Sequence, residues 1–215
     1  MNLLNALTFG PPLLILFYIF KSDKFPEPWQ CILWTFLAGC FICIPAGYLN
    51  DIFIPTNEYS YIAGLTEESL KFLAFLLLVS TKIQFNERMD AIVYGVAISI
   101  GFATYENYFY VYSLGFNDPL GVAIMRMLSA IPLHAMCGVI MGYYLGLYFY
   151  TNKNNMLLKA LIIPIFVHGL YNYSLNFGGL WFLLLFITFF QIKKMHNEFK
   201  SYQLLKKEER EIRNK

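Results

Sequence analysis

Carboxylates and imidazoles occur inside the long apolar stretches of this chain, where ionisable side chains are costly and usually mark a functional site or a buried pair. Five of these side chains could do chemistry directly: Glu67, Glu68, Glu106, His134 and His168. In a pocket of low dielectric such groups can supply a general base that activates water and a group that stabilises an oxyanion. Two histidines with one or two glutamates could equally hold a divalent metal. The residue types predict a chemical site, and they leave carboxylate-activated water and metal chemistry both open.

Serine and cysteine nucleophiles are less well supported. The chain has no GxSxG motif, and Cys137, three residues after His134, has nothing beside it in the sequence that would activate a thiol. Cys40 and Cys43 form a CxxC, but no second pair has zinc-ligand spacing. We expect buried, unreactive thiols.

The composition predicts that membrane helices position these residues. Of the 215 residues 58% are hydrophobic and only 14% are charged, whereas a soluble domain has about 25% charged residues. Twelve of the 30 charged residues fall within 193–215, which leaves 18 for residues 1–192. These figures exclude a soluble globule, a disordered chain and a disulfide-rich secreted module. Membrane lipid is therefore an expected partner, and a nucleic acid is not.

We predict an all-α, polytopic bundle of about seven transmembrane spans. A span needs about 20 apolar residues, and the candidate segments are 2–20, 30–48, 61–81, 90–110, 121–150, 156–176 and 178–192. Pro132 should kink or divide the fifth segment, which would leave 120–131 as a surface or re-entrant piece. Residues 1–192 then form one transmembrane domain, and residues 193–215 form a basic tail.

The distribution of Lys and Arg predicts the orientation. Fourteen of the 16 lie in one alternate set of connections or in the tail, and the other set has none. The basic connections contain Lys21, Lys24, Lys82, Arg88, Lys153 and Lys159. By the positive-inside rule the N-terminus lies outside and the tail lies in the cytoplasm. We expect the tail to be a solvated helix on anionic headgroups, with His196 in solvent.

The depth of the ionisable groups indicates that they meet. With a rise of about 1.5 Å per residue, Glu67, Glu106 and His168 lie roughly 6 to 12 Å below the outer ends of three different spans. His134 joins them if its helix begins at Pro132, and it continues a stripe of small residues that lets helices approach closely. Spans that run in opposite directions would not share this depth unless the residues form one site on the outer side.

Three further residues are candidates for a supporting role. Lys71 lies three residues after Glu68 and four after Glu67, so it can pair with either carboxylate. Arg126 could join the site, or it could only extend to the outer surface. Asn172 lies four residues after His168 and shares its helix face.

Four motifs, each on its own span, resemble those of the PrsW family of bacterial intramembrane proteases. They are Glu67-Glu68-Ser69-Leu70-Lys71, an EExxK; Phe102 to Glu106, an FxxxE; His134 to Gly138, an HxxxG; and His168 to Asn172, an HxxxN. The chain is more distantly similar to the CAAX prenyl-endopeptidase and ABI membrane proteases, whose motifs have EExxxR and FxxxH. At Lys71 and Glu106 the sequence differs from the motifs of that wider group and resembles those of PrsW.

The resemblance implies an endopeptidase of the bacterial plasma membrane that makes the first, extracytoplasmic cut in a single-span regulator such as an anti-sigma factor. It further implies that Glu67 or Glu68 activates water and that the other carboxylates and histidines share protons or ligate a metal. Phe102 and Lys71 would support them, and Asn172 would orient His168 or donate to the substrate carbonyl. The cofactor is either none or a divalent metal such as Zn²⁺.

Two other classes remain as alternatives. A proton- or cation-coupled transporter also uses intramembrane Glu and His, although the chain lacks the internal repeat typical of such folds. A non-catalytic scaffold would use the same groups only to specify helix packing.

Overall fold

The computed structural model describes residues 2–80 and 85–213, with side chains up to residue 208. This part of the chain is helical throughout, as predicted, and it contains no strand. Its α-helices are α1 (Leu3–Ser22), α2 (Trp29–Phe53), α3 (Ile62–Leu78), α4 (Arg88–Tyr112), α5 (Pro119–Leu128), α6 (Ala130–Thr151), α7 (Asn154–Ser174) and α8 (Leu180–Arg213). Two short 3-10 helices, Asn57–Tyr59 and Leu175–Phe177, lie in connections.

The fifth predicted span is divided, and its two parts are α5 and α6. The side chain of Asp118 caps α5 by accepting a hydrogen bond from the Gly121 N–H at 2.9 Å. The break falls at Ser129, so Pro132 lies in the first turn of α6. A proline is tolerated there because the N–H groups of a first turn have no partner within the helix.

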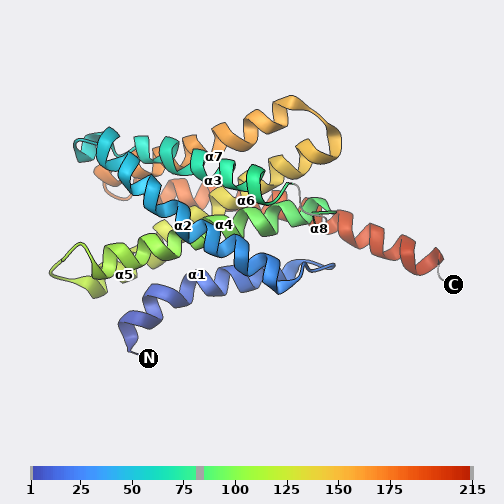
Figure 1. Cartoon of the computed structure of the whole chain (residues 1–215), viewed down its shortest axis with the longest axis horizontal. Helices are drawn as coiled ribbons and strands as arrows, with labels where there is room; N and C mark the ends of the chain where they lie inside the picture. The colour runs from blue at the N-terminus through green and yellow to red at the C-terminus, as the bar shows by residue number, and fades with distance from the viewer. Residues whose placement is uncertain (1, 81–84, 214–215) are drawn as a thin grey trace.

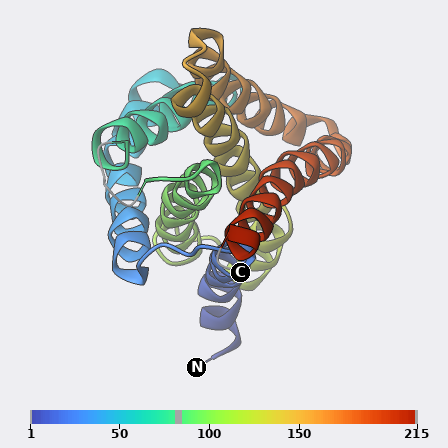
Figure 2. The ribbon, with the colours of Figure 1, turned by 90° about the vertical axis from the view of Figure 1, so that its right-hand side faces the viewer.

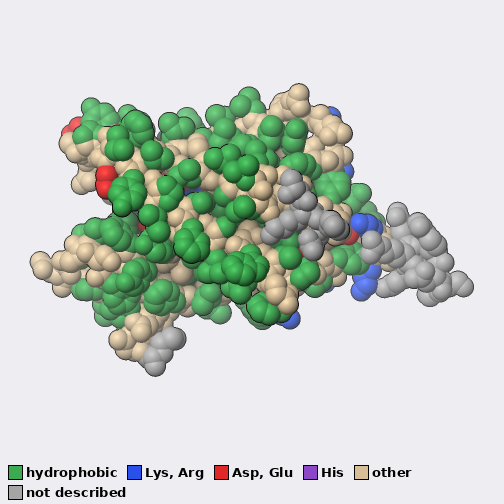
Figure 3. Space-filling model, in the orientation of Figure 1, with side chains coloured by type: hydrophobic (Ala, Val, Ile, Leu, Met, Phe, Trp, Pro, Cys, Tyr) green, Lys and Arg blue, Asp and Glu red, His purple; other side chains and the backbone are tan. Residues whose placement is uncertain are grey.

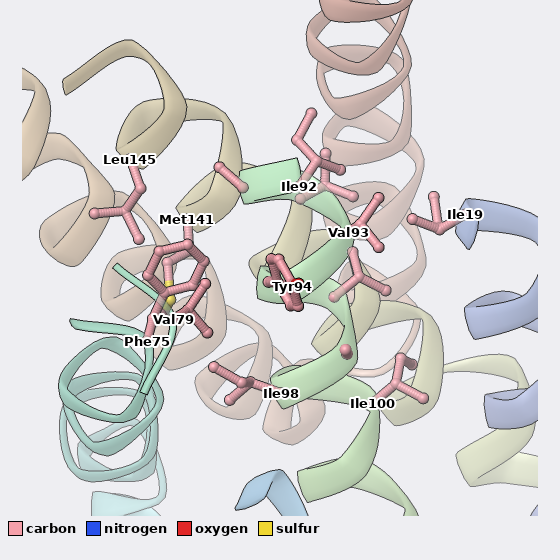
Figure 4. Close-up of a cluster of buried hydrophobic side chains, with 14 of the residues drawn as sticks. Ile19, Phe75, Val79, Ile92, Val93, Tyr94, Ile98, Ile100, Met141 and Leu145 are labelled. Carbon is pink, nitrogen blue, oxygen red and sulfur yellow. The ribbon is translucent and has the colours of Figure 1, made fainter. Parts of the chain in front are cut away.

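Helix α4 lies in the middle of the bundle, with the other long helices around it (Figures 1 and 2). It packs against α6, α2 and α1, while α3 packs against α7. Its side chains Ile92, Val93, Tyr94, Ile98 and Ile100 are fully buried and form the centre of the hydrophobic core (Figure 4). The same helix carries the motif residue Glu106, whose side chain is 17% exposed.

Small residues let α6 approach α4 closely, as the predicted stripe requires. A methyl group added to Gly138 would lie 2.8 Å from the backbone oxygen of Gly95, and one added to Gly146 would lie 2.9 Å from that of Arg88. No side chain fits at these positions, so the two helix backbones are in contact along this face. His134 lies one turn before Gly138 and is therefore directed into the bundle.

The outer surface of the bundle suits a bilayer. Hydrophobic side chains cover much of the middle of the face seen in Figure 3, and Leu14, Trp34, Phe41, Leu77 and Phe166 are all exposed. Within the described residues, four segments are long and apolar enough to cross a membrane: α1, α2, α5 with α6, and α7 extended to Phe177. The remaining predicted spans are helical as α3, α4 and α8. The count of seven spans and the sides of the two termini remain predictions, and Lys82 lies outside the described residues.

The tail differs from its prediction as a solvated helix on lipid headgroups. Helix α8 continues from the last predicted span through residue 193, and one face of its tail half packs against the bundle. Phe199 is 1% exposed and stacks near Tyr143, with ring centroids 4.8 Å apart. The prediction that His196 is solvated is wrong: it is buried, and its Nε2 lies 2.8 Å from the Ser22 hydroxyl. The helical spacing of His196, Phe199 and Gln203 puts all three on this buried face.

A group of polar side chains, here called the tail cluster, joins this face to the bundle. Its members come from the α1–α2 connection, the start of α4 and the tail. Six are buried, namely Asp23, Glu27, Glu87, Asp90, Tyr94 and Gln203, and the seventh, Lys206, is partly exposed. Gln203 Nε2 donates to Asp23 Oδ1 at 2.8 Å and to Glu87 Oε2 at 2.9 Å. Lys206 Nζ lies 2.6 Å from Glu87 Oε1. The tail is thus held by side-chain hydrogen bonds as well as by apolar packing.

Candidate active site

Close helix packing brings the motif residues together. A methyl group on Gly64 of α3 would lie 2.5 Å from the backbone nitrogen of Gly169 of α7, so these helices touch one turn before Glu68 and directly after His168. Helix α4 presents Glu106, and α6 presents His134. We call the resulting group the motif cluster, and its members are Glu67, Glu68, Lys71, Glu106, Arg126, His134 and His168.

Lys71 lies at the centre of the motif cluster and is fully buried. Its Nζ donates to Glu68 Oε1 at 2.7 Å and to His134 Nδ1 at 2.9 Å, and it lies 3.8 Å from Glu67 Oε2. The ammonium group also lies 4.1 Å from the centre of the Phe102 ring, a cation–π distance. The predicted pairing with the two glutamates is present, and Phe102 covers the charged group.

His168 is held by the second of the two adjacent glutamates. Its Nδ1 lies 2.8 Å from Glu68 Oε1, and its Nε2 lies 3.8 Å from Glu67 Oε2. A carboxylate beside Nδ1 favours the tautomer in which Nδ1–H donates, which leaves the Nε2 lone pair facing Glu67. This is how carboxylates commonly orient a metal-binding histidine.

Three of the five candidates can hold a metal together. Glu67, His134 and His168 each offer one ligand atom, and these atoms lie within 4.8 Å of one another. Glu67 Oε2 is buried and has no hydrogen-bond partner among the described residues. Two imidazoles and a carboxylate suit Zn²⁺, so the side chains fit a divalent metal. His134 gives up its contact with Lys71 or Glu106 when it acts as a ligand.

Glu106 and Arg126 form an ion pair beside His134, outside the three residues that could hold a metal. The Glu106 Oε2 atom lies 2.9 Å from His134 Nε2 and 2.7 Å from Arg126 Nη2. Arg126 Nε donates to Asn107 Oδ1 at 2.9 Å, and its guanidinium carbon lies 4.1 Å from the Tyr110 ring centre. The alternative in which Arg126 only extends to the outer surface is therefore wrong. The carboxylate of Glu106 draws the guanidinium into the protein.

Asn172 lies beside the site but does not contact His168 in the way expected. Its Nδ2 donates to the backbone oxygen of Ser60 at 3.2 Å, whereas Glu68 makes the contact that orients His168. Asn172 and His168 share a helix face, as predicted, but their side chains contact different neighbours. A role for Asn172 toward a substrate carbonyl stays a prediction.

The motif cluster opens on a cleft of about 1420 Å³. The cleft is lined by residues from the end of α2 and the start of α5, which lie at the end of the bundle opposite the tail, on the left in Figure 1. Glu67, Glu106, His134, His168 and Asn172 line the cleft. Glu68 and Lys71 are not among its lining residues and are fully buried behind it. A peptide in the cleft could therefore reach the potential metal ligands and Glu106.

Two contacts in the site involve residues that the motifs do not include. Asn50 Nδ2 donates to Glu67 Oε1 at 3.0 Å, and the Thr66 hydroxyl donates to Asn50 Oδ1. Asn50 lies near the end of α2, and Thr66 directly precedes the EExxK motif. The sequence prediction ended the second span at residue 48 and so placed Asn50 in the connection, whereas α2 continues to Phe53. Which helix α3 would meet there could not be read from the sequence.

The chain matches one protein family over most of its length. The family is described as PrsW family intramembrane metalloprotease and matches residues 27–193. The chain is 32% identical over 194 residues to Protease PrsW of Clostridioides difficile, which covers 83% of this chain and 82% of that protein. It is also 32% identical over 193 residues to Protease PrsW of Bacillus subtilis, with 84% and 87% covered. No solved structure matches it.

Proposed function

The chain belongs to the PrsW family of intramembrane metalloproteases, and from this premise we propose that it cuts a single-span regulator of the anti-sigma-factor kind on the extracytoplasmic side of the bacterial plasma membrane. The observation that carries the proposal is the meeting of Glu67, His134 and His168 at the floor of a cleft. The charge distribution supports the orientation, because the α1–α2 and α6–α7 connections, the start of α4 and the tail, which carry basic residues, lie at the end opposite the cleft.

Glu67, His134 and His168 would hold the metal, which we propose to be Zn²⁺. A bound Zn²⁺ polarises a carbonyl and lowers the pKa of a bound water. Glu68 fixes the His168 ring through Nδ1, so that Nε2 faces Glu67. Lys71 compensates the negative charge of the two adjacent glutamates in a region that excludes water.

Glu106 is the carboxylate best placed to move a proton. It lines the cleft, lies outside the proposed ligand set, and contacts both His134 and Arg126. We assign it the task of taking a proton from the attacking water and passing it to the leaving amine. Arg126 holds this carboxylate in place, and Asn172 donates to the substrate carbonyl. Glu68, buried behind the cleft, is thereby assigned to positioning rather than to water activation.

The test is cleavage of a single-span candidate substrate in reconstituted vesicles. Glu67→Gln and His168→Gln should lose both cleavage and bound Zn²⁺, and a chelator should inhibit wild type reversibly. Glu58→Gln is the matched control, because Glu58 is exposed near the same end of the bundle. Folded Glu67→Gln protein that cuts as fast as wild type would contradict the proposal.

The two alternative classes gain no support. A transporter or a scaffold does not explain the family membership, and the cleft lies at one end of the bundle rather than at its middle.

A further inference from the structure

We propose that Asn50, held by Thr66, is a positioning residue that turns one oxygen of Glu67 toward the metal site. The inference rests on the proposed function, because it assigns a task within that site. It brings into the site a helix, α2, that carries none of the four motifs.

Local connectivity puts the three residues at one level. Helix α2 ends at Phe53 and α3 begins at Ile62, with a short connection between them. Asn50 lies in the last turn of α2, while Thr66 and Glu67 lie in the second turn of α3. The two helices form a hairpin, so these turns face each other next to the cleft.

The hydrogen bonds determine which way the amide of Asn50 points. Asn50 Oδ1 is the nearest acceptor to the Thr66 hydroxyl, closer than the backbone oxygen of Ala63 at 3.2 Å. Asn50 Nδ2 donates to Glu67 Oε1 at 3.0 Å. The reverse orientation would set the amide oxygen against a carboxylate oxygen, and neither can donate. Thr66 is buried and Asn50 is partly buried, so water competes poorly for these contacts.

Because of this contact, the two carboxylate oxygens of Glu67 differ in their hydrogen bonding. Among the described residues, Asn50 is the side chain that donates a hydrogen bond to Glu67, and it uses Oε1. The other oxygen, Oε2, is buried without a hydrogen-bond partner and lies 3.8 Å from both His168 Nε2 and Lys71 Nζ. A carboxylate with one oxygen anchored presents the other one as a single ligand atom.

Asn50 suits this task because its amide is neutral. A second ammonium group at this position would add positive charge next to the metal, and a second carboxylate would repel Glu67. Groups that hydrogen-bond to metal ligands commonly change metal affinity or activity by about 10- to 100-fold when they are removed. The contact should therefore be measurable in metal binding independently of catalysis.

The experiment uses full-length protein in detergent and measures Zn²⁺ affinity by competition with a chelating dye. Asn50→Leu should bind Zn²⁺ about 10- to 100-fold more weakly than wild type, and its kcat should fall with little change in KM. Thr66→Val should act in the same direction with a smaller effect, and Thr66→Ser should restore wild-type affinity. Thr188→Val is the matched control, since the hydroxyl of this buried threonine bonds to its own helix at Leu184.

Wild-type Zn²⁺ affinity in folded Asn50→Leu would overturn the inference. If Asn50→Leu does not fold, the Thr66 pair decides: equal affinity in Thr66→Val and Thr66→Ser would also overturn it. Failure of the proposed function is read separately, because it would appear as wild-type protein that binds no Zn²⁺ and cuts no candidate substrate, and that result would overturn both proposals.

Discussion

The bundle buries two polar groups of similar size at opposite ends, and they are built differently. In the motif cluster, each of the three glutamates lies within 4 Å of Lys71 or Arg126, and the group opens on a cleft. In the tail cluster, which has four carboxylates, Gln203 and Lys206 of the tail helix contact two of them, Asp23 and Glu87. Burial, opposed by the Tyr94 hydrogen bond and reinforced by Asp23 and Glu87, raises the pKa of Glu27 there.

This difference distinguishes a cluster that can do chemistry from a cluster that attaches the tail. Both clusters hold buried carboxylate oxygens without a hydrogen-bond partner among the described residues. The motif cluster also has imidazoles and opens on a cleft, so it can accept a ligand, whereas the tail cluster is contacted by the tail helix. A buried polar group in a membrane protein is therefore informative when it faces a cleft. Matched substitutions in the two clusters test this distinction.

The largest difference should appear in catalysis. Glu106→Gln should lower kcat by about 10²- to 10⁴-fold, the usual contribution of a general base, because an amide cannot accept the proton. Glu87→Gln in the tail cluster should leave kcat unchanged, since Glu87 lies at the other end of the bundle. Steady-state cleavage in vesicles measures both, and an equal loss in the two folded variants would contradict the comparison.

The next difference concerns stability. Lys71→Met should cost about 3–5 kcal/mol, because it leaves Glu68 as an uncompensated buried charge. Lys206→Met should cost less, about 1 kcal/mol, because the Lys206 side chain is 35% exposed and the buried Glu87 keeps its hydrogen bond from Gln203. Thermal unfolding in detergent compares them. Equal unfolding temperatures would show that burial does not distinguish the two lysines.

The smallest effect should be a pH dependence of tail docking. Burial, reinforced by Lys200, lowers the pKa of His196 in the docked tail. An undocked histidine takes up a proton near its ordinary pKa of about 6.5, so the undocked form binds more protons below that pH. Docking should therefore be strongest above this value and should weaken as the pH falls through the lowered pKa.

Cleavage of the tail by a glutamate-specific endoproteinase, at pH values on both sides of 6.5, measures this effect. His196→Asn keeps a polar side chain beside Ser22 but cannot titrate in this range, and it is the control. If the pH dependence of wild type is retained in His196→Asn, another group in the tail region is responsible.

Much of the fold and of the site could be predicted because helical spacing and apolar length are local properties. These two properties predicted the helical segments, the break before Pro132, the small-residue face of α6 and the pairing of Lys71 with its two glutamates. A spacing of four residues also placed Asn172 on the same helix face as His168. The neighbour of each side chain, however, depends on how α7 is rotated against α3.

The sequence by itself determined that this is a helical membrane protein, and it predicted that the ionisable residues lie at matching depths on separate spans, since composition and periodicity depend on the chain alone. Only the tertiary structure decided that Glu67 lies with His134 and His168 in a group that could hold a metal while Glu68 contacts His168 from the buried side. It also decided that Arg126 turns inward, that Asn50 contacts Glu67, and that the tail docks. The physical reason is that each of these contacts joins different helices or distant turns. Their relative rotation is set by the packing of many side chains at once, whereas a motif specifies only neighbours along one helix.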